Sequence, residues 1–329
     1  MRRFNDTFKK TYGRSPRDLR RNNVESFDSD SVLTVRLPYR KPFDWSAMIH
    51  FFAGRATPGV EQILDDAYLR SISIDGQPGV IECCHLIKDG SVSLTLHGVA
   101  TAEVFQVVQR AREMLDLDAP VAEIAAVLGA DDVLGALLKR SPGIRVPGAW
   151  DGFELTVRAI LGQQVSVKAA TTLAGRIAAR YGGAMQVPES LAGRDDRLTI
   201  NRLFPTPEKL MRARFNDIGL VTSRAETIRR VASAVVHGDL SFDNSQDVDE
   251  FCKALTEIRG IGDWTAQYVA MRALKSPDAF PASDLGLLKA VQEDKKVKPA
   301  ELLQSTEPWR PWRAYAALLL WGSLPGSGG

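Results

Sequence analysis

"EIRGIGDWTAQY", residues 257–268, is the stretch of sequence that decides how the second half of this chain folds. Gly260 and Gly262 stand one residue apart, and two glycines this close supply a tight backbone turn at no steric cost. A helical pattern follows at once, and the first amide groups of a helix have no partner within it. Such a helix end attracts anions, phosphate among them.

The wider stretch 251–274 has the pattern helix, tight turn, helix. As a helix-hairpin-helix, its turn would present backbone amides to one DNA phosphate, a contact that positions a duplex and reads no sequence. From geometry alone, a purely structural corner between two helices is an equally good interpretation. A dinucleotide-binding fingerprint is excluded, because Thr265 stands where its third glycine belongs and no strand precedes the turn.

The composition is that of a folded protein of two or three domains, with 329 residues, 44% hydrophobic and 25% charged. Residues 1–22 carry eight basic and two acidic side chains, a net charge of +6. Since the whole chain has a charge of +2, the remainder is at −4. The basic segment indicates a polyanionic partner, whereas any nucleic-acid contact elsewhere must be local.

Targeting and metal-binding signals are lacking in the sequence. Cys83, Cys84 and Cys252 give neither a disulfide framework nor a zinc spacing, and the four histidines are scattered. The longest apolar run near the end, "AYAALLLW", is too short to cross a bilayer. We therefore expect a cytoplasmic protein with reduced thiols, without a metal and without a membrane partner.

The pattern of elements predicts an α+β fold: a small mixed α/β N-terminal domain followed by two all-helical lobes. We expect a remnant segment over 1–28, the α/β domain over 29–118 and the helical region over 119–329, with a flexible loop at about 183–205. Helices are expected at 44–56 and 101–115. The predicted strands are 31–38, 68–75, 79–87 and 91–98.

Five motifs, in order along residues 31–322, carry a resemblance to a known family. The hairpin "GIGDWTAQY" and the later "FPASD" resemble the helix-hairpin-helix DNA glycosylases, whose hairpin is followed by a catalytic aspartate. Within that superfamily the sequence is most similar to the bacterial 3-methyladenine DNA glycosylase II (AlkA) type. The hairpin is one of the five motifs, and the other four are "PFDWSAMIHFFAGRA" (42–56), "FELTVRAILGQQVSV" (153–167), "FPTPEKL" (204–210) and "PWRAYAALLLW" (311–321).

The basic segment carries a second resemblance. Its pattern F-x3-F-x3-Y-G-x-S-P-x2-L-R-R is similar to the closing helices of an AraC-type helix-turn-helix domain. Only the end of such a domain is present, so we expect residues 1–28 to be the remnant of a regulator–repair fusion, or of a chain whose start was assigned at an internal methionine. A basic leader without a function is the alternative.

Asp284 is the candidate catalytic residue. From its position between Ser283 and an apolar helical pattern, a helix N-cap is the simpler interpretation. The resemblance implies that it is the catalytic carboxylate, which would stabilise the oxocarbenium character of the sugar as the glycosidic bond breaks. One side chain can serve as both cap and catalyst.

Aromatic residues are the candidates for the substrate-base pocket. Trp264 and Tyr268 lie four apart on one helical face, a spacing that usually indicates core packing. The resemblance places them with Trp321 around the flipped base, and Phe51 and Arg55 close the pocket from the N-terminal domain. Because an alkylated purine is cationic, an aromatic face would attract it by roughly 0.5–2 kcal/mol.

The remaining candidates concern DNA. The hairpin residues Gly260, Gly262 and Thr265 are expected to bind the duplex, and Gln164 in "ILGQQVSV" is expected to fill the gap that a flipped base leaves. The best-known relative has leucine at the position of Gln164. The resemblance puts a lysine at the position of Trp264 in strand-cleaving members, so we expect a monofunctional enzyme that leaves an abasic site.

The resemblance implies a monomer that excises alkylated bases from double-stranded DNA without a cofactor, with a monovalent cation at the hairpin. 3-Methyladenine, 7-methylguanine, hypoxanthine and ethenoadenine remain open as lesions. Two other classes compete with this interpretation: a non-catalytic helix-hairpin-helix DNA-binding protein, and a DNA-binding regulator of the alkylation response. The collinear motifs disfavour the first, and the incomplete helix-turn-helix pattern disfavours the second.

Overall fold

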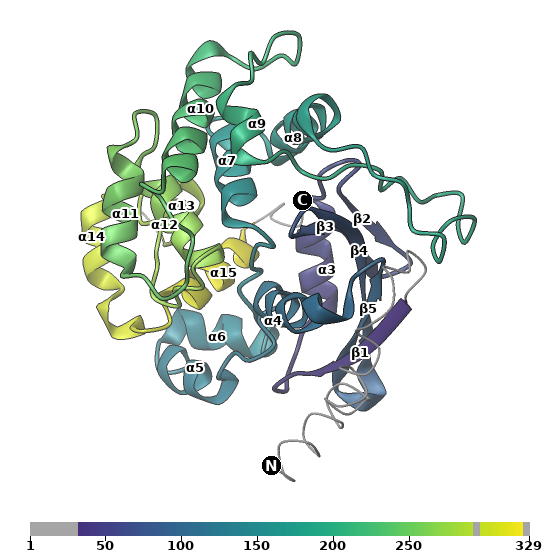
Figure 1. The fold of residues 1–329 in the computed structure, drawn as a ribbon. Helices are drawn as coiled ribbons and strands as arrows, with labels where there is room; N and C mark the ends of the chain where they lie inside the picture. Colours follow the sequence, from purple (N-terminus) through teal and green to yellow (C-terminus); the bar gives the residue numbers. More distant parts are fainter. Residues whose placement is uncertain (1–31, 292–296, 325–329) are drawn as a thin grey trace.

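The computed structural model describes residues 32–291 and 297–324 (Figure 1). The remnant expected over 1–28 lies outside the described residues. Within them a small sheet domain is followed by a larger helical region, so the predicted α+β class is confirmed. No described helix has both the length and the apolar character needed to cross a membrane.

The N-terminal domain is built on one antiparallel sheet of five strands in the order β1-β5-β4-β3-β2. Four strands arise where alternating or β-branched residues predict them. The strand that sequence patterns miss, β2, has four residues and no alternation. The strands are β1 (Val32–Pro38), β2 (Glu61–Leu64), β3 (Ala67–Ile74), β4 (Gln77–Leu86) and β5 (Ser91–His97).

The two faces of this sheet are covered differently. Helices α3 (Trp45–Ala53) and α4 (Val104–Met114) pack against one face and share a buried core with it. Asp44 begins α3 as its N-cap by accepting a hydrogen bond from the amide of Ala47 at 2.9 Å. Both helices were expected, and both are confirmed within a few residues.

The other face is covered by the segment expected to be a flexible loop, 183–205. It has no helix or strand beyond an isolated bridge between Ala184 and Arg202. Nevertheless Met185, Leu191 and Ile200 are buried against residues of β3 and β4. The segment is therefore a loop, as expected, and its apolar side chains pack against the outer face of the sheet.

The helical region forms one continuous buried core. Its α-helices are α5 (Val121–Leu128), α6 (Asp132–Arg140), α7 (Gly152–Gly162), α8 (Val167–Tyr181), α9 (Pro207–Met211), α10 (Thr222–His237), α11 (Val248–Glu257), α12 (Asp263–Arg272), α13 (Leu285–Val291), α14 (Pro299–Ser305) and α15 (Arg313–Ser323). Helix α7 packs on α8, α10 and α12, and α15 packs on α6 and α13 (Figure 1).

Candidate active site and nucleic-acid interface

The turn between α11 and α12 has the hairpin geometry that its glycines predict. Gly260 has a φ of +101°, and a Cβ placed there would lie 2.1 Å from Oγ1 of Thr227. Only glycine is compatible with that position. Gly262 differs, because a Cβ there would meet no atom within 4 Å. Gly262 is also the N-cap of α12 and provides no side chain to bond its first amides. The open side of Gly262 therefore leaves room for a group from outside the protein.

A glutamine that the sequence did not single out ties this hairpin to the turn between α7 and α8. The side-chain amide of Gln163 donates to the carbonyl of Gly260 at 3.1 Å and to Oγ1 of Thr265 at 3.2 Å. Thr265 is buried at 2% exposure, so its hydroxyl braces the hairpin from within. The neighbouring Gln164 is exposed and has a φ of +57°, a strained conformation for a residue other than glycine. Gln164 thus stands at the tip of a turn whose base is anchored to the hairpin.

Asp284 is held by three hydrogen bonds at the start of α13. The indole Nε1 of Trp264 donates to Oδ2 at 2.7 Å, and that of Trp321 donates to Oδ1 at 2.8 Å. The amide of Leu287 also donates to Oδ1 at 2.9 Å, so Asp284 caps the helix as its position predicts. Donors from three elements, α12, α13 and α15, therefore set the orientation of one carboxylate.

A cleft of about 380 Å³ opens beside this carboxylate. The structure brings together here every residue predicted for the pocket and the catalytic group, from α3, α12, α13 and α15. The rings of Trp264 and Tyr268 lie parallel, with an interplanar angle of 7° and centroids 5.2 Å apart. The predicted residues that line the cleft are Phe51, Arg55, Trp264, Tyr268, Asp284 and Trp321.

Guanidinium groups form part of the cleft wall, which sequence reasoning did not foresee beyond Arg55. The Cζ of Arg55 lies 4.0 Å from the ring centroid of Phe51, and that of Arg272 lies 4.8 Å from the same ring. Arg272 also lies 5.2 Å from the ring centroid of Tyr268. Two of the aromatic rings thus already have cationic partners within the protein.

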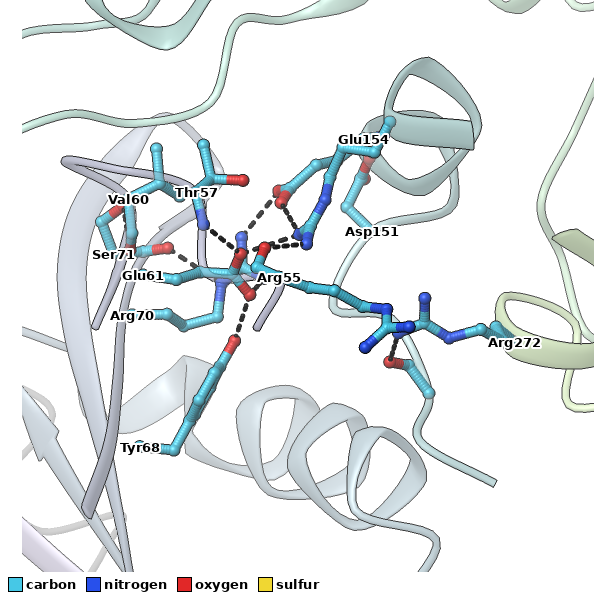
Figure 2. Close-up of polar contacts among 12 residues, drawn as sticks. Arg55, Thr57, Val60, Glu61, Tyr68, Arg70, Ser71, Asp151, Glu154 and Arg272 are labelled. Atoms are coloured by element: carbon cyan, nitrogen blue, oxygen red, sulfur yellow. Dashed lines mark hydrogen bonds and ion pairs between the residues drawn. The ribbon is translucent and has the colours of Figure 1, made fainter. Parts of the chain in front are cut away.

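Behind the cleft, a buried ion network joins the sheet domain to α7 (Figure 2). Arg158 of α7 donates to Oε2 of Glu61 at 2.7 Å and to Oε1 of Glu154 at 3.2 Å. Arg70 of β3 donates to Oε2 of Glu154 at 2.7 Å, and the hydroxyl of Tyr68 donates to Oε1 of Glu61 at 2.6 Å. Two arginines therefore face two glutamates, and no net charge is buried.

This network also positions the pocket. Arg158 lines the cleft and donates a short hydrogen bond to the carbonyl of Arg55 at the end of α3. Arg55 lies in the turn that follows α3, so this hydrogen bond ties the end of the helix that carries Phe51 to α7. Burial alone would raise the pKa of Glu61, but Arg158 and Arg70 outweigh it and lower that pKa to about 2. Glu61 is therefore charged at neutral pH.

The side chains that line the cleft determine which reactions it can support. A carboxylate that two indoles hold beside apolar walls can stabilise a positive charge that develops next to it. The aromatic and aliphatic part of the lining suits the planar face of a ring system. Within the described residues no group of three or more histidine, cysteine, aspartate or glutamate side chains is placed to hold a metal ion.

Two protein families match this chain in sequence. Residues 34–151 match the family described as "AlkA N-terminal domain". Residues 157–311 match the "HhH-GPD superfamily base excision DNA repair protein" family. The first match covers the sheet domain and the segment leading to α7, and the second covers the hairpin and Asp284.

Individual relatives agree with these matches. The chain is 34% identical to DNA-3-methyladenine glycosylase 2 of Escherichia coli, over 87% of its own length and 95% of that protein. It is 35% identical to a probable bifunctional transcriptional activator/DNA repair enzyme AlkA of Mycobacterium tuberculosis, over 98% of its own length. The chain spans 64% of the length of that relative.

The fold has a counterpart among solved structures. A 3-methyladenine DNA glycosylase from Archaeoglobus fulgidus superposes with a TM-score of 0.73, covering 87% of this chain and 96% of that one. At 23% sequence identity, this similarity supports the architecture of sheet domain and helical region.

Proposed function

Because the chain belongs to the helix-hairpin-helix superfamily of base-excision DNA repair proteins, in the family of DNA-3-methyladenine glycosylase 2, we propose that it is a monofunctional DNA glycosylase. It flips alkylated bases of the 3-methyladenine and 7-methylguanine type out of duplex DNA and hydrolyses their N-glycosidic bonds. The observation that carries this proposal is the Asp284 carboxylate, held by two indole N–H groups at the edge of the cleft.

Asp284 acts on the sugar. When the bond between C1′ and the base breaks, the electron pair leaves with the base and the sugar gains positive charge. A carboxylate that already points at the sugar needs no reorganisation to stabilise that charge. Water then bonds to C1′ and gives up a proton, which completes the hydrolysis.

The walls of the cleft act on the base. Trp264, Tyr268 and Trp321 present aromatic surface to a flipped base. Phe51 of α3 and Arg55 of the turn after it close the cleft from the N-terminal domain. The position of Trp264 also supports a single activity, because an indole cannot form the Schiff base that strand cleavage requires.

The hairpin and the neighbouring turn act on the duplex. The open side of Gly262 suits a phosphate at the N-terminus of α12. Gln164, exposed at the tip of its turn, fills the gap left by the flipped base. Gln163 links the two turns. The distance between the phosphate contact at Gly262 and the inserted side chain of Gln164 is therefore fixed.

A pair of glycine substitutions separates the fold of the hairpin from its binding role. Gly260→Ala is expected to destabilise the protein by about 2 kcal/mol, since its Cβ meets Thr227 at a positive φ. Gly262→Ala is expected to leave the free energy of unfolding within about 0.5 kcal/mol, because its Cβ meets nothing. Its affinity for duplex DNA should still fall about 10-fold, because the methyl group occupies the side where the phosphate approaches.

Urea denaturation and fluorescence anisotropy with a lesion-free duplex measure the two effects. An unchanged DNA affinity of the Gly262→Ala protein would remove the hairpin from the proposed interface.

No cofactor enters this reaction. A monovalent cation at the hairpin would use its backbone carbonyls. The carbonyls of Ile258 and Gly260 each accept one protein hydrogen bond and keep a second lone pair, so the residues present fit such an ion. We further infer that the chain acts on double-stranded DNA as a monomer.

The direct test is release of free base from a methylated duplex, with strand nicking followed in parallel. We expect free base to accumulate and strands to break only after alkaline treatment, which cleaves at abasic sites. A protein that binds the duplex and releases no base would favour the alternative of a non-catalytic DNA-binding protein or regulator. Nicking without alkali would instead indicate a strand-cleaving glycosylase.

A further inference from the structure

Arg272 is a buried cation without a carboxylate partner. Its exposure is 5%, and no ion pair among the described residues includes it. Its Nε donates to the carbonyl of Pro147 at 2.7 Å and its Nη2 to that of Gly148 at 3.1 Å. The remaining nitrogen, Nη1, donates to the phenol oxygen of Tyr268 at 2.5 Å. An unpaired buried charge is costly, and the hydrogen bonds to two backbone carbonyls and one tyrosine offset that cost for this guanidinium.

This contact determines what the Tyr268 hydroxyl can still do. A phenol has one proton to donate, and a guanidinium can only donate. The hydrogen bond from Arg272 therefore uses a lone pair of the oxygen and leaves its proton free. No hydrogen bond donated by Tyr268 is found within residues 32–291 and 297–324, and both residues line the cleft beside Asp284.

The surroundings also make this hydroxyl a stronger donor. Burial raises the pKa of Tyr268, but the charges of Arg272 and Arg55 outweigh burial and bring that pKa below its usual value. A more acidic hydroxyl gives a stronger hydrogen bond to an acceptor that gains negative charge.

From this geometry we propose that Tyr268 donates a hydrogen bond to the edge of the flipped base, and that Arg272 positions its oxygen for this role. The inference rests on the proposed glycosylase function and concerns its substrate range. A base methylated on a ring nitrogen carries a positive charge and leaves as a neutral molecule. An uncharged base takes the electron pair of the broken bond and leaves as an anion. The donor stabilises this negative charge, and the proton stays on Tyr268. Tyr268 and Arg272 thus favour the excision of uncharged bases with an acceptor on their edge.

The test compares two duplexes of identical sequence, one with 7-methylguanine and one with hypoxanthine, under single-turnover conditions. Tyr268→Phe keeps the ring and removes only the hydroxyl. We expect hypoxanthine release to fall at least about 10-fold, since one preorganised donor to a developing anion is worth about this much or more. Release of 7-methylguanine should fall by a clearly smaller factor, because this base leaves as a neutral molecule and not as an anion. The measured quantity is therefore the ratio of the two rates. Arg272→Lys should shift the ratio of the two rates in the same direction.

Tyr181→Phe is the matched control, because its hydroxyl bonds the amide of Phe215 and does not line the cleft. It should leave both rates unchanged. An equal loss on both duplexes with Tyr268→Phe would overturn the inference and leave a packing role. So would a wild-type protein that releases 7-methylguanine and no hypoxanthine. If the wild-type protein releases neither base, the glycosylase function itself fails, which is a distinguishable result.

Discussion

Replacing Asp284 by asparagine is expected to slow base release by about 10³-fold, equivalent to about 4 kcal/mol of transition-state stabilisation. The substitution keeps the shape of the side chain, and asparagine caps a helix about as well as aspartate. The two indoles donate to different oxygens of Asp284. The substitution therefore removes the negative charge and the acceptor for one indole N–H group, because asparagine has a single side-chain oxygen. Affinity for a duplex should stay within about 3-fold, since the proposed phosphate contacts lie elsewhere.

The chain offers a control with the same local structure outside the cleft. Asp131 caps α6 by accepting the amides of Val133 and Leu134, and its Oδ2 accepts the indole Nε1 of Trp309 at 3.0 Å. Asp131→Asn therefore changes a capping aspartate with an indole partner, but at a site that does not line the cleft. We expect its base release to equal that of the wild type. If Asp284→Asn retained more than about a tenth of wild-type activity, Asp284 would be a helix cap and no more.

The second large effect is on stability. Glu61→Gln is expected to lower the free energy of unfolding by about 3–5 kcal/mol, because the buried Arg70 and the partly buried Arg158 would then share a single carboxylate. The hydroxyl of Tyr68 donates to Oε1 of Glu61 and the amide of Thr57 donates to Oε2. A glutamine has one side-chain oxygen and keeps only one of these two hydrogen bonds, so the loss reports on the charge together with one hydrogen bond. Urea denaturation followed by tryptophan fluorescence measures it.

An exposed pair in the same domain provides the comparison. Asp65 bonds Arg197 at 2.6 Å, and both side chains are more than half exposed. Asp65→Asn removes a carboxylate from a surface pair and should cost less than about 1 kcal/mol. Equal losses for the two substitutions would contradict the claim that burial decides the strength of the network.

The same network predicts a pH dependence. The pKa of Glu61 is lowered to about 2 in the folded protein from an ordinary value of 4.5. Its contribution to stability is therefore complete above about pH 4.5 and disappears as the pH falls towards 2. In the Glu61→Gln protein this part of the acid sensitivity should be absent, and unfolding curves at pH 3 and pH 6 would reveal the difference.

Local patterns were sufficient for much of the fold. Alternation in β3, β4 and β5 and the period of α3 and α4 predicted these elements, because their backbones follow from residues near in sequence. The short β2 has no alternation and forms as an edge strand by pairing with β3. The segment 183–205 is irregular, but it packs on a sheet face that is built from other parts of the chain. Neither the edge strand nor this packing follows from local pattern.

By itself, the sequence determined the hairpin at Gly260 and the cap at Asp284, because each depends on neighbouring residues. It also determined the family, because the motifs occur in a fixed order along the chain. Only the tertiary structure decided that Trp264 and Trp321 each bind one oxygen of Asp284 and that Arg272 donates a hydrogen bond to the hydroxyl of Tyr268. The same holds for Gln163, whose side chain anchors the hairpin. These contacts join side chains from separate helices, and their geometry depends on how the helices pack rather than on spacing along the chain.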